Sequence, residues 1–191
     1  SQPTDPGKLA SRSSLRPADR ALVSDPELIL EFSEFDPDRV LFDQEAIRQY
    51  NAHRFEIEQL TAIVFEDQER QISVGYRDVS GDEFWARGHF PGRPTLPSVL
   101  LCESAAQLCC FHVQRAQLAE TDMLGFAALD EVEFGPPVIP GQRVLVVGRA
   151  ARIRRGVLVM WQFQQFVDGR LVCHGVLKGV PLKREWLTRS R

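Results

Sequence analysis

The sequence lacks a long apolar run and an excess of basic charge. Its most apolar segment, around Val99, is interrupted by Glu103 and Gln107, so no stretch reaches the ~18 residues that a membrane-spanning helix needs. The 191 residues carry a net charge of -3, which provides no general attraction to nucleic acid. The first residues also lack the apolar segment of a secretory signal. We therefore expect a cytoplasmic protein with no membrane span and no nucleic-acid partner.

Paired cysteines are missing too. Three of the 4 cysteines, Cys102, Cys109 and Cys110, lie in one apolar segment, and Cys173 is far from them in the chain. No C-x-x-C spacing occurs, which argues against a zinc site, and the distribution is not that of a disulfide framework. We expect buried free thiols and no metal site.

The composition, 43% hydrophobic and 26% charged, predicts one folded domain with a good-sized core. We place it at residues 45–182, between an N-terminal extension (1–44) and a short C-terminal tail (183–191). Residues 1–24 show no apolar periodicity and are expected to be disordered or loosely attached. Residues 26–40 mix apolar and acidic side chains, which suits either a short strand or a clamp lying across the domain surface. Residues 43–50 predict a short helix with Asp43 as its N-cap.

The remaining pattern predicts an α+β fold. Alternation of apolar and polar residues indicates strands at 72–77 and at its hairpin partner 57–65, and four more at 123–134, 143–153, 157–167 and 171–180. Turn dipeptides, among them Asp168-Gly169, separate the last strands. Residues 98–117 contain no Gly or Pro and predict one long helix. We expect an antiparallel sheet wrapped around this central helix. Because the helix is apolar nearly all round, we also expect a second subunit to cover part of it.

The least ordinary residues lie between positions 87 and 107. Prolines at 91, 94 and 97 favour an extended path that begins near His89 and leads into the helix. Glu103 follows within the apolar helix, where a carboxylate without a partner is costly to bury. One interpretation makes His89 a packing histidine and Glu103 half of a buried salt bridge with Arg87 or Arg93. The functional interpretation is a carboxyl group tuned by its surroundings for proton transfer.

Two further features of the helix favour a catalytic site. Val99, Glu103 and Gln107 share one helical face, so Gln107 can orient Glu103 or hold a bridging water. The backbone N–H groups near Ser98 and Val99 have no partner within the helix, and such groups suit an oxygen that gains negative charge.

The segment His-Phe-Pro-Gly-Arg-Pro-Thr-Leu-Pro-Ser-Val-Leu-Leu-Cys-Glu-Ser-Ala-Ala-Gln, residues 89–107, resembles the signature of the β-hydroxyacyl-[acyl carrier protein] dehydratases of fatty-acid synthesis. The similarity extends to His53-Arg54-Phe55, to residues 125–134 and 137–141, to Arg154-Arg-Gly156 and to Val167-Asp-Gly169, and covers about residues 45–182.

The resemblance implies a hotdog fold and a homodimer, with a trimer of dimers left open. In this family the histidine and the acid of one site come from different subunits, so His89 would face Glu103 of the other copy. His89 would remove the C2 proton and Glu103 would protonate the departing 3-hydroxyl, giving a trans-2-enoyl thioester without any cofactor. Phe90 and Pro97 would help to bind the substrate, together with Ser98, Val99 and Gln107.

The implied partner is an acyl carrier protein that bears its acyl chain on phosphopantetheine. It is acidic, so we expect it to dock on Arg87, Arg93, Arg154 and Arg155. One departure from the family is Ser98, where the family usually has glycine. Because of it, an acyl-thioester-binding protein without turnover is an alternative, as is a hotdog thioesterase.

Overall fold

The structure is a computed structural model, and it describes residues 26–119 and 123–182. Our expectations for residues 1–24 and 183–191 lie outside the described residues. The longest helix is α2 (Val99–Arg115), close to the prediction of 98–117. The strands are β1 (Phe42–Asp43), β2 (Ala62–Asp67), β3 (Ile72–Asp78), β4 (Leu124–Phe134), β5 (Arg143–Arg154), β6 (Leu158–Val167) and β7 (Arg170–Pro181). The short helices are α1 (Gln44–Ile47) and the 3-10 turns η2 (Phe32–Glu34) and η3 (Phe55–Ile57).

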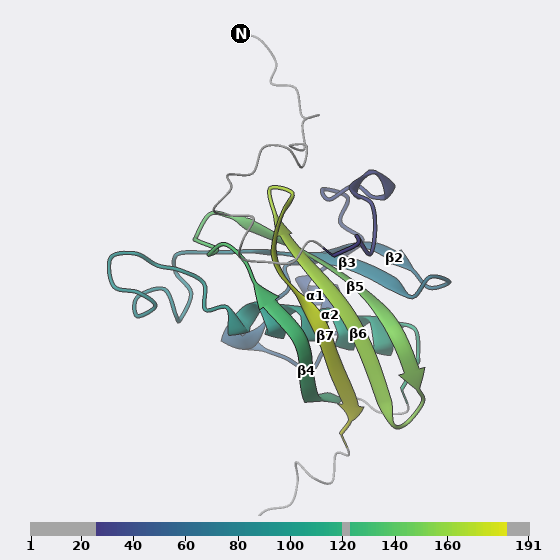
Figure 1. Cartoon of the computed structure of the whole chain (residues 1–191). Helices are drawn as coiled ribbons and strands as arrows, with labels where there is room; N and C mark the ends of the chain where they lie inside the picture. Colours follow the sequence, from purple (N-terminus) through teal and green to yellow (C-terminus); the bar gives the residue numbers. More distant parts are fainter. Residues whose placement is uncertain (1–25, 120–122, 183–191) are drawn as a thin grey trace, which may run out of the picture.

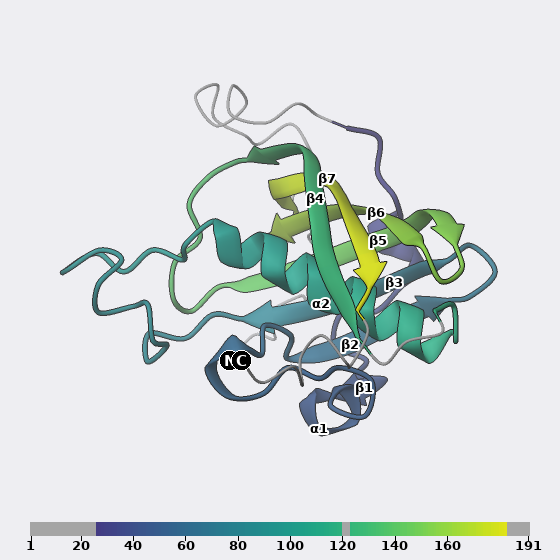
Figure 2. The ribbon, with the colours of Figure 1, turned by 90° about the horizontal axis from the view of Figure 1, so that it is seen from below.

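The strands form one antiparallel sheet in the order β1-β2-β3-β5-β6-β7-β4. It curves around α2, which lies across its concave side (Figures 1 and 2). This is the predicted arrangement, an antiparallel sheet wrapped around a central helix. Strand β4 pairs only with β7 and forms one edge of the sheet within the described chain.

The core between the sheet and α2 follows from the alternation seen in the sequence. Along β6, Val159, Trp161 and Phe163 point inward and are at most 3% exposed. The inward amide of Gln165 donates to the carbonyl of Leu101 and to the hydroxyl of Ser104, which ties the helix to the sheet. The amide nitrogen of Gln165 is thus paired in this core, whereas its Oε1 and the indole Nε1 of Trp161 are buried without a hydrogen-bond partner among the described residues.

Two predicted elements differ from the structure by more than two residues in their bounds. The first long strand begins at Ala62 rather than at residue 57, because Phe55 has a left-handed φ of 61° and residues 55–57 form a 3-10 turn. The helix predicted at 43–50 is confirmed only over Gln44–Ile47. Its predicted N-cap is present, since Asp43 accepts a hydrogen bond from the backbone N–H of Ala46.

The convex face of the sheet is covered by residues 26–35, which we call the strap. The clamp interpretation of this segment is therefore correct and the strand interpretation is wrong. Leu30 of the strap is 3% exposed, and Phe32 packs edge-on against Phe166. Gln164, which points away from the helix, accepts from the N–H of Ile29 and donates to the carbonyl of Glu27. A second apolar cluster thus lies on the side of the sheet opposite α2.

Residues 42–60 cover part of the helix that the sequence analysis assigned to a second subunit. Phe42 and Tyr50 pack edge-on against Phe111 of α2. The side chain of Asn51 donates to the carbonyl of Gln107. The positions of α2 that are not buried are Val99, Glu103, Cys110, Gln114 and Arg115, and the first four form a single stripe along the helix. Among the described residues, no helix is both long and apolar enough to cross a membrane.

Candidate active site

His89 lies on the loop that connects β3 to α2, and this loop extends away from the body of the molecule (Figures 1 and 2). Glu83 holds the base of the loop. Its carboxylate pairs with the guanidinium of Arg77, which is 3% exposed, and accepts from the indole N–H of Trp85 at 2.9 Å. A buried arginine requires such a partner, so the loop is anchored at its start. At its end, the N–H of Leu96 donates to the carbonyl of Val138.

The ring of His89 is held in one orientation. Its Nδ1 lies 2.7 Å from the carbonyl oxygen of Thr95. A carbonyl only accepts, so Nδ1 carries the proton and, in the neutral ring, Nε2 keeps a free lone pair. The backbone N–H of Thr95 bonds to the carbonyl of His89 at 2.7 Å, and the ring stacks on Phe90 at 4.2 Å. His89 is thus held by its Nδ1, and its Nε2 is on the side of the ring away from the Thr95 carbonyl.

The first turn of α2 presents unpaired backbone N–H groups. The N–H groups of Leu100 and Leu101 bond to the carbonyls of Pro97 and Ser98, whereas those of Ser98 and Val99 have no partner among the described residues. Both of these residues are exposed. Ser98 has φ -59° and ψ -27°, an ordinary helical conformation, so the backbone does not require the glycine that the family usually has here.

Glu103 and Gln107 lie one turn apart on α2, as their spacing predicted, and are hydrogen bonded. The amide Nε2 of Gln107 donates to Oε1 of Glu103 at 2.8 Å and to the carbonyl of Ile57 at 2.6 Å. The Oε1 of Gln107 accepts from the backbone N–H of Gln59 at 2.8 Å. Gln107 therefore joins the carboxyl group of Glu103 to the segment that precedes β2.

His53 is the site residue that the sequence analysis did not assign. Its Nε2 lies 3.4 Å from Oε1 of Glu103 in the same chain. Burial lowers the pKa of His53, while the charges of Glu103 and Glu58 oppose this shift. The only sequence signal was the His-Arg-Phe triplet before the first long strand, which counted as part of the resemblance. No periodicity connects position 53 with position 103.

An apolar pocket opens beside this pair. Glu103 and His53 line it at the polar end, and its other lining residues are Ala106, Cys109, Cys110, Leu124, Gly125, Phe126, Leu177 and Gly179. A neighbouring pocket of about 140 Å³ shares His53, Cys110 and Leu124 with it. Burial raises the pKa of Cys110 to about 12, so its thiol stays protonated and acts as an apolar lining group.

The structure brings some predicted residues together and leaves others apart. No contact within the described chain joins His89 to Glu103. Neither Arg87 nor Arg93 contacts Glu103, so the two arginines suggested as salt-bridge partners are not its partners within the described chain. Phe90 is 57% and Val99 is 69% exposed.

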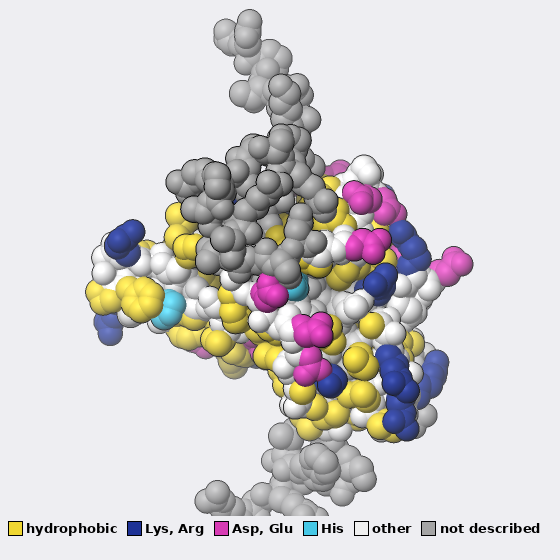
Figure 3. All heavy atoms as spheres, in the orientation of Figure 1, with side chains coloured by type: hydrophobic (Ala, Val, Ile, Leu, Met, Phe, Trp, Pro, Cys, Tyr) yellow, Lys and Arg dark blue, Asp and Glu magenta, His cyan; other side chains and the backbone are white. Residues whose placement is uncertain are grey.

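The four arginines expected to dock the carrier protein fall into two groups. Arg87 and Arg93 are on the loop between β3 and α2, and Arg154 and Arg155 are on the β5–β6 hairpin. These elements lie at opposite ends of the molecule, with basic side chains at each (Figures 1 and 3). One chain therefore does not present them as a single patch.

Comparison with known proteins gives a consistent result. The model of the family described as "FabA-like domain" matches residues 51–175. Among solved structures, the dehydratase heterocomplex ApeI:P from Xenorhabdus doucetiae contains a similar chain at 14% identity and a TM-score of 0.61, covering 74% of this chain and 93% of that one. Cj0977, a sigma28-regulated virulence protein from Campylobacter jejuni, aligns at 9% identity and a TM-score of 0.54, covering 75% and 94%. At these identities the solved structures show the fold alone.

Proposed function

Because the chain belongs to the family of FabA-like domains, as the resemblance of residues 89–107 predicted, we propose that it dehydrates 3-hydroxyacyl thioesters to trans-2-enoyl thioesters. The natural substrate in this proposal is carried by acyl carrier protein. The observation that carries the proposal is the hydrogen bond from Nδ1 of His89 to Thr95, which leaves Nε2 as a base. The acid at the edge of an apolar pocket, Glu103, is the second requirement of the reaction.

In the proposed reaction, Nε2 of His89 takes the proton from C2 of the substrate. The electron pair of that C–H bond forms the C2–C3 double bond, and the C3–O bond breaks. Glu103 gives its proton to the departing hydroxyl, which leaves as water. Negative charge that develops on the thioester oxygen is stabilised by the free N–H groups of Ser98 and Val99. Atoms and charge balance without a metal or an organic cofactor.

The proposed site is shared between two copies of the chain. Several features support this: His89 lies on an extended loop, Glu103 is on an open stripe of α2, and β4 leaves one edge unpaired within the described residues. Phe126 and Leu129 of β4, exposed by 46% and 47%, add apolar surface next to the pocket. We propose a homodimer in which His89 of one copy faces Glu103 of the other. A trimer of dimers and a cytoplasmic location stay predictions.

Docking of the acidic carrier protein on basic side chains is part of the same proposal. In a shared site, the loop of one copy and the hairpin of the other are the elements that could combine Arg87 and Arg93 with Arg154 and Arg155. Reversing the charge of all four arginines should raise the KM for the carrier-bound substrate and leave that for a short pantetheine thioester unchanged. Equal KM changes for both substrates would contradict this docking site.

The test of the function is an assay with a 3-hydroxyacyl carrier-protein thioester, in which mass spectrometry detects the loss of water. We expect turnover by the parent and a loss of at least ~100-fold in His89→Ala and in Glu103→Ala. Release of a free thiol instead of the enoyl product would favour a thioesterase. Binding without water loss, with both variants equal to the parent, would favour an acyl-binding protein.

Mixing the two variants tests the shared site. A heterodimer of His89→Ala and Glu103→Ala has one site that lacks both groups and one that keeps both. Co-expressed variants should therefore regain activity that neither has alone. Inactive mixed dimers, verified by tags on the two chains, would show that the two residues do not act across an interface.

A further inference from the structure

The carboxyl group of Glu103 is contacted on one oxygen only. Gln107 Nε2 lies 2.8 Å and His53 Nε2 lies 3.4 Å from Oε1. The other oxygen, Oε2, has no hydrogen-bond partner among the described residues. It is not one of the buried polar atoms without a partner. Oε2 is therefore accessible, and Glu103 lines the apolar pocket. The two oxygens of this carboxyl group are in different environments.

The direction of the Gln107 hydrogen bond is determined by its other contacts. Its Oε1 accepts from the N–H of Gln59, so its Nε2 must be the atom that faces Glu103. The second hydrogen of Nε2 goes to the carbonyl of Ile57. Gln107 can thus only donate to Oε1 of Glu103, because a flipped amide would place its oxygen against the carbonyl of Ile57 and the carboxyl oxygen of Glu103, and its NH2 group against the N–H of Gln59.

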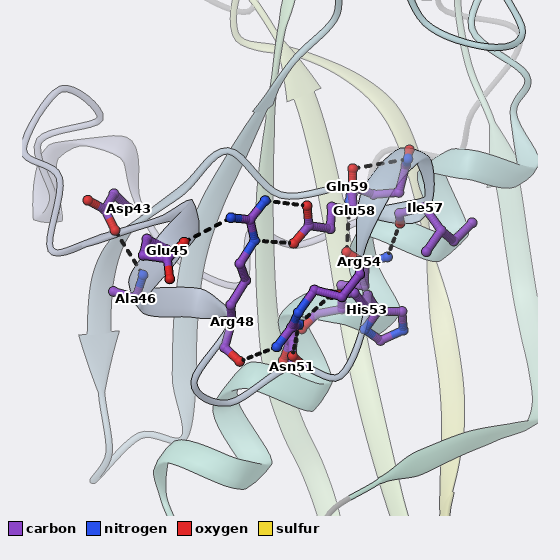
Figure 4. A network of polar contacts seen from close by, with 11 residues as sticks. Asp43, Glu45, Ala46, Arg48, Asn51, His53, Arg54, Ile57, Glu58 and Gln59 are labelled. Carbon is purple, nitrogen blue, oxygen red and sulfur yellow. Dashed lines mark hydrogen bonds and ion pairs between the residues drawn. The ribbon is translucent and has the colours of Figure 1, made fainter. Parts of the chain in front are cut away.

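His53 is held beside the same oxygen by a polar network (Figure 4). Arg48 donates to both carboxylate oxygens of Glu58, at 2.7 and 2.8 Å, and Arg54 donates to the carbonyls of Asn51 and Arg48. These contacts connect α1 to both sides of position 53. The segment that carries the imidazole is therefore fixed independently of Glu103.

The tautomer of His53 follows from its surroundings. Its Nδ1 is buried and has no partner among the described residues. A proton on Nδ1 would bury an unpaired donor and turn the lone pair of Nε2 toward an oxygen of Glu103, which costs more than a bare buried acceptor. The charged groups that act on the ring are Glu103, Glu58 and the adjacent Arg54, and the thiol of Cys110 lines the same pocket. Burial lowers the pKa of His53, which favours the neutral ring with its proton on Nε2, the nitrogen that lies toward Glu103.

We infer that His53 is a positioning residue for Glu103, because its Nε2 lies 3.4 Å from Oε1 and the amide of Gln107 donates to that same oxygen, which leaves Oε2 as the oxygen that carries the proton to the substrate. The role in turnover rests on the proposed function, whereas the pairing of His53 with Glu103 does not. The donor from Gln107 on Oε1 is compatible with a protonated Oε2, since Oε1 is then the carbonyl oxygen of the acid. This donor and the nearby imidazole of His53 also stabilise the carboxylate that remains after proton transfer.

The pairing is tested by NMR titration of the 4 histidine side chains in the full-length protein. The charge of Glu103 favours the protonated form of His53. We therefore expect Glu103→Gln to lower the pKa of His53 further and to leave that of His112, on the far face of α2, unchanged. A pKa of His53 that is the same in parent and Glu103→Gln would overturn the pairing, whatever the activity of the protein.

The role in catalysis is tested by kcat and KM. His53→Leu should lower kcat about tenfold, the equivalent of about 1.4 kcal/mol, with KM nearly unchanged. His53→Gln, whose amide can donate to Oε1, should recover much of this loss. His174→Gln, on the outer side of β7, is the matched control and should keep the parent kcat.

Two outcomes contradict the proposal in distinguishable ways. Equal loss of kcat in His53→Leu and His53→Gln, accompanied by equal loss of thermal stability, would show a structural role only. An inactive parent would refute the proposed function and the acid role of Glu103, and the NMR titration would still decide whether His53 and Glu103 are paired.

Discussion

The strap provides a sharp test of which contacts stabilise the fold. Leu30 is 3% exposed and belongs to the apolar cluster on the convex face of the sheet. Truncating a buried leucine to alanine costs ~2–5 kcal/mol, depending on how far the surroundings collapse into the cavity. For a chain of this size, ~1 kcal/mol lowers the Tm by ~2–4 °C. We therefore expect Leu30→Ala to lower the Tm by ~6–12 °C, for a cost of about 3 kcal/mol.

The assay is thermal unfolding followed by circular dichroism, together with amide hydrogen exchange at Ile29, whose N–H bonds to Gln164. If the strap detaches before the sheet unfolds, exchange at Ile29 should accelerate more than the global Tm falls. Dehydratase kcat should stay at the parent value, because the strap lies on the side of the sheet opposite α2 and Glu103. The matched control is Leu41→Ala, whose side chain is 41% exposed and should cost under ~1 kcal/mol. Equal stability of both variants would refute the claim that the strap is part of the folded core.

Three further predictions concern single positions. Gly148→Ala should destabilise the protein by ~1–3 kcal/mol in chemical denaturation, because the new Cβ would lie 2.4 Å from the ring of Trp161. Gly81→Ala, where the atom nearest to the new Cβ is at 3.9 Å, is the control. Equal denaturation midpoints of the two variants would contradict the packing argument. Ser98→Gly should change stability by only a few tenths of a kcal/mol, since Ser98 makes no side-chain cap hydrogen bond; a loss above ~1 kcal/mol would show that the hydroxyl has a partner. Burial lowers the pKa of His112 from 6.5 to about 4, so between these pH values the unfolded chain binds a proton that the folded chain does not, and stability should fall as the pH falls through this range. Urea midpoints measured from pH 4 to 7 should depend less steeply on pH in His112→Gln than in the parent. An unchanged pH dependence would contradict the role of His112.

Much of the fold was predictable because it depends on local patterns. Alternation along β6 predicted which side chains enter the core, and the N-cap of α1 follows from a single Asp and its helical neighbours. The predicted start of the first long strand was wrong because Phe55 adopts a left-handed conformation, which the alternation of apolar residues does not reveal. The sequence did not decide whether the strap is a strand or a clamp, because its contacts depend on Gln164, which lies 135 positions from Ile29.

The candidate site was also predictable only in part. Residues 89–107 formed one continuous segment whose prolines, helix start and Glu103–Gln107 spacing were all visible in the sequence. His53 was not assigned a role because its contact to Glu103 spans the whole hairpin of β2 and β3 and the loop that follows it. The cover of α2 by Phe42 and Tyr50 was missed for the same reason, so the sequence analysis assigned this part of the helix surface to a second subunit.

The sequence by itself determined the family, the sheet around a central helix, and the segment that carries His89 and Glu103. These depend on periodicity and on residues adjacent along the chain. Only the tertiary structure decided that the strap covers the convex face, that Nε2 of His89 is the free nitrogen, and that Gln107 and His53 lie against the same oxygen of Glu103. Tautomers and hydrogen-bond directions are set by which donor or acceptor lies opposite, and those partners meet only when distant segments pack together.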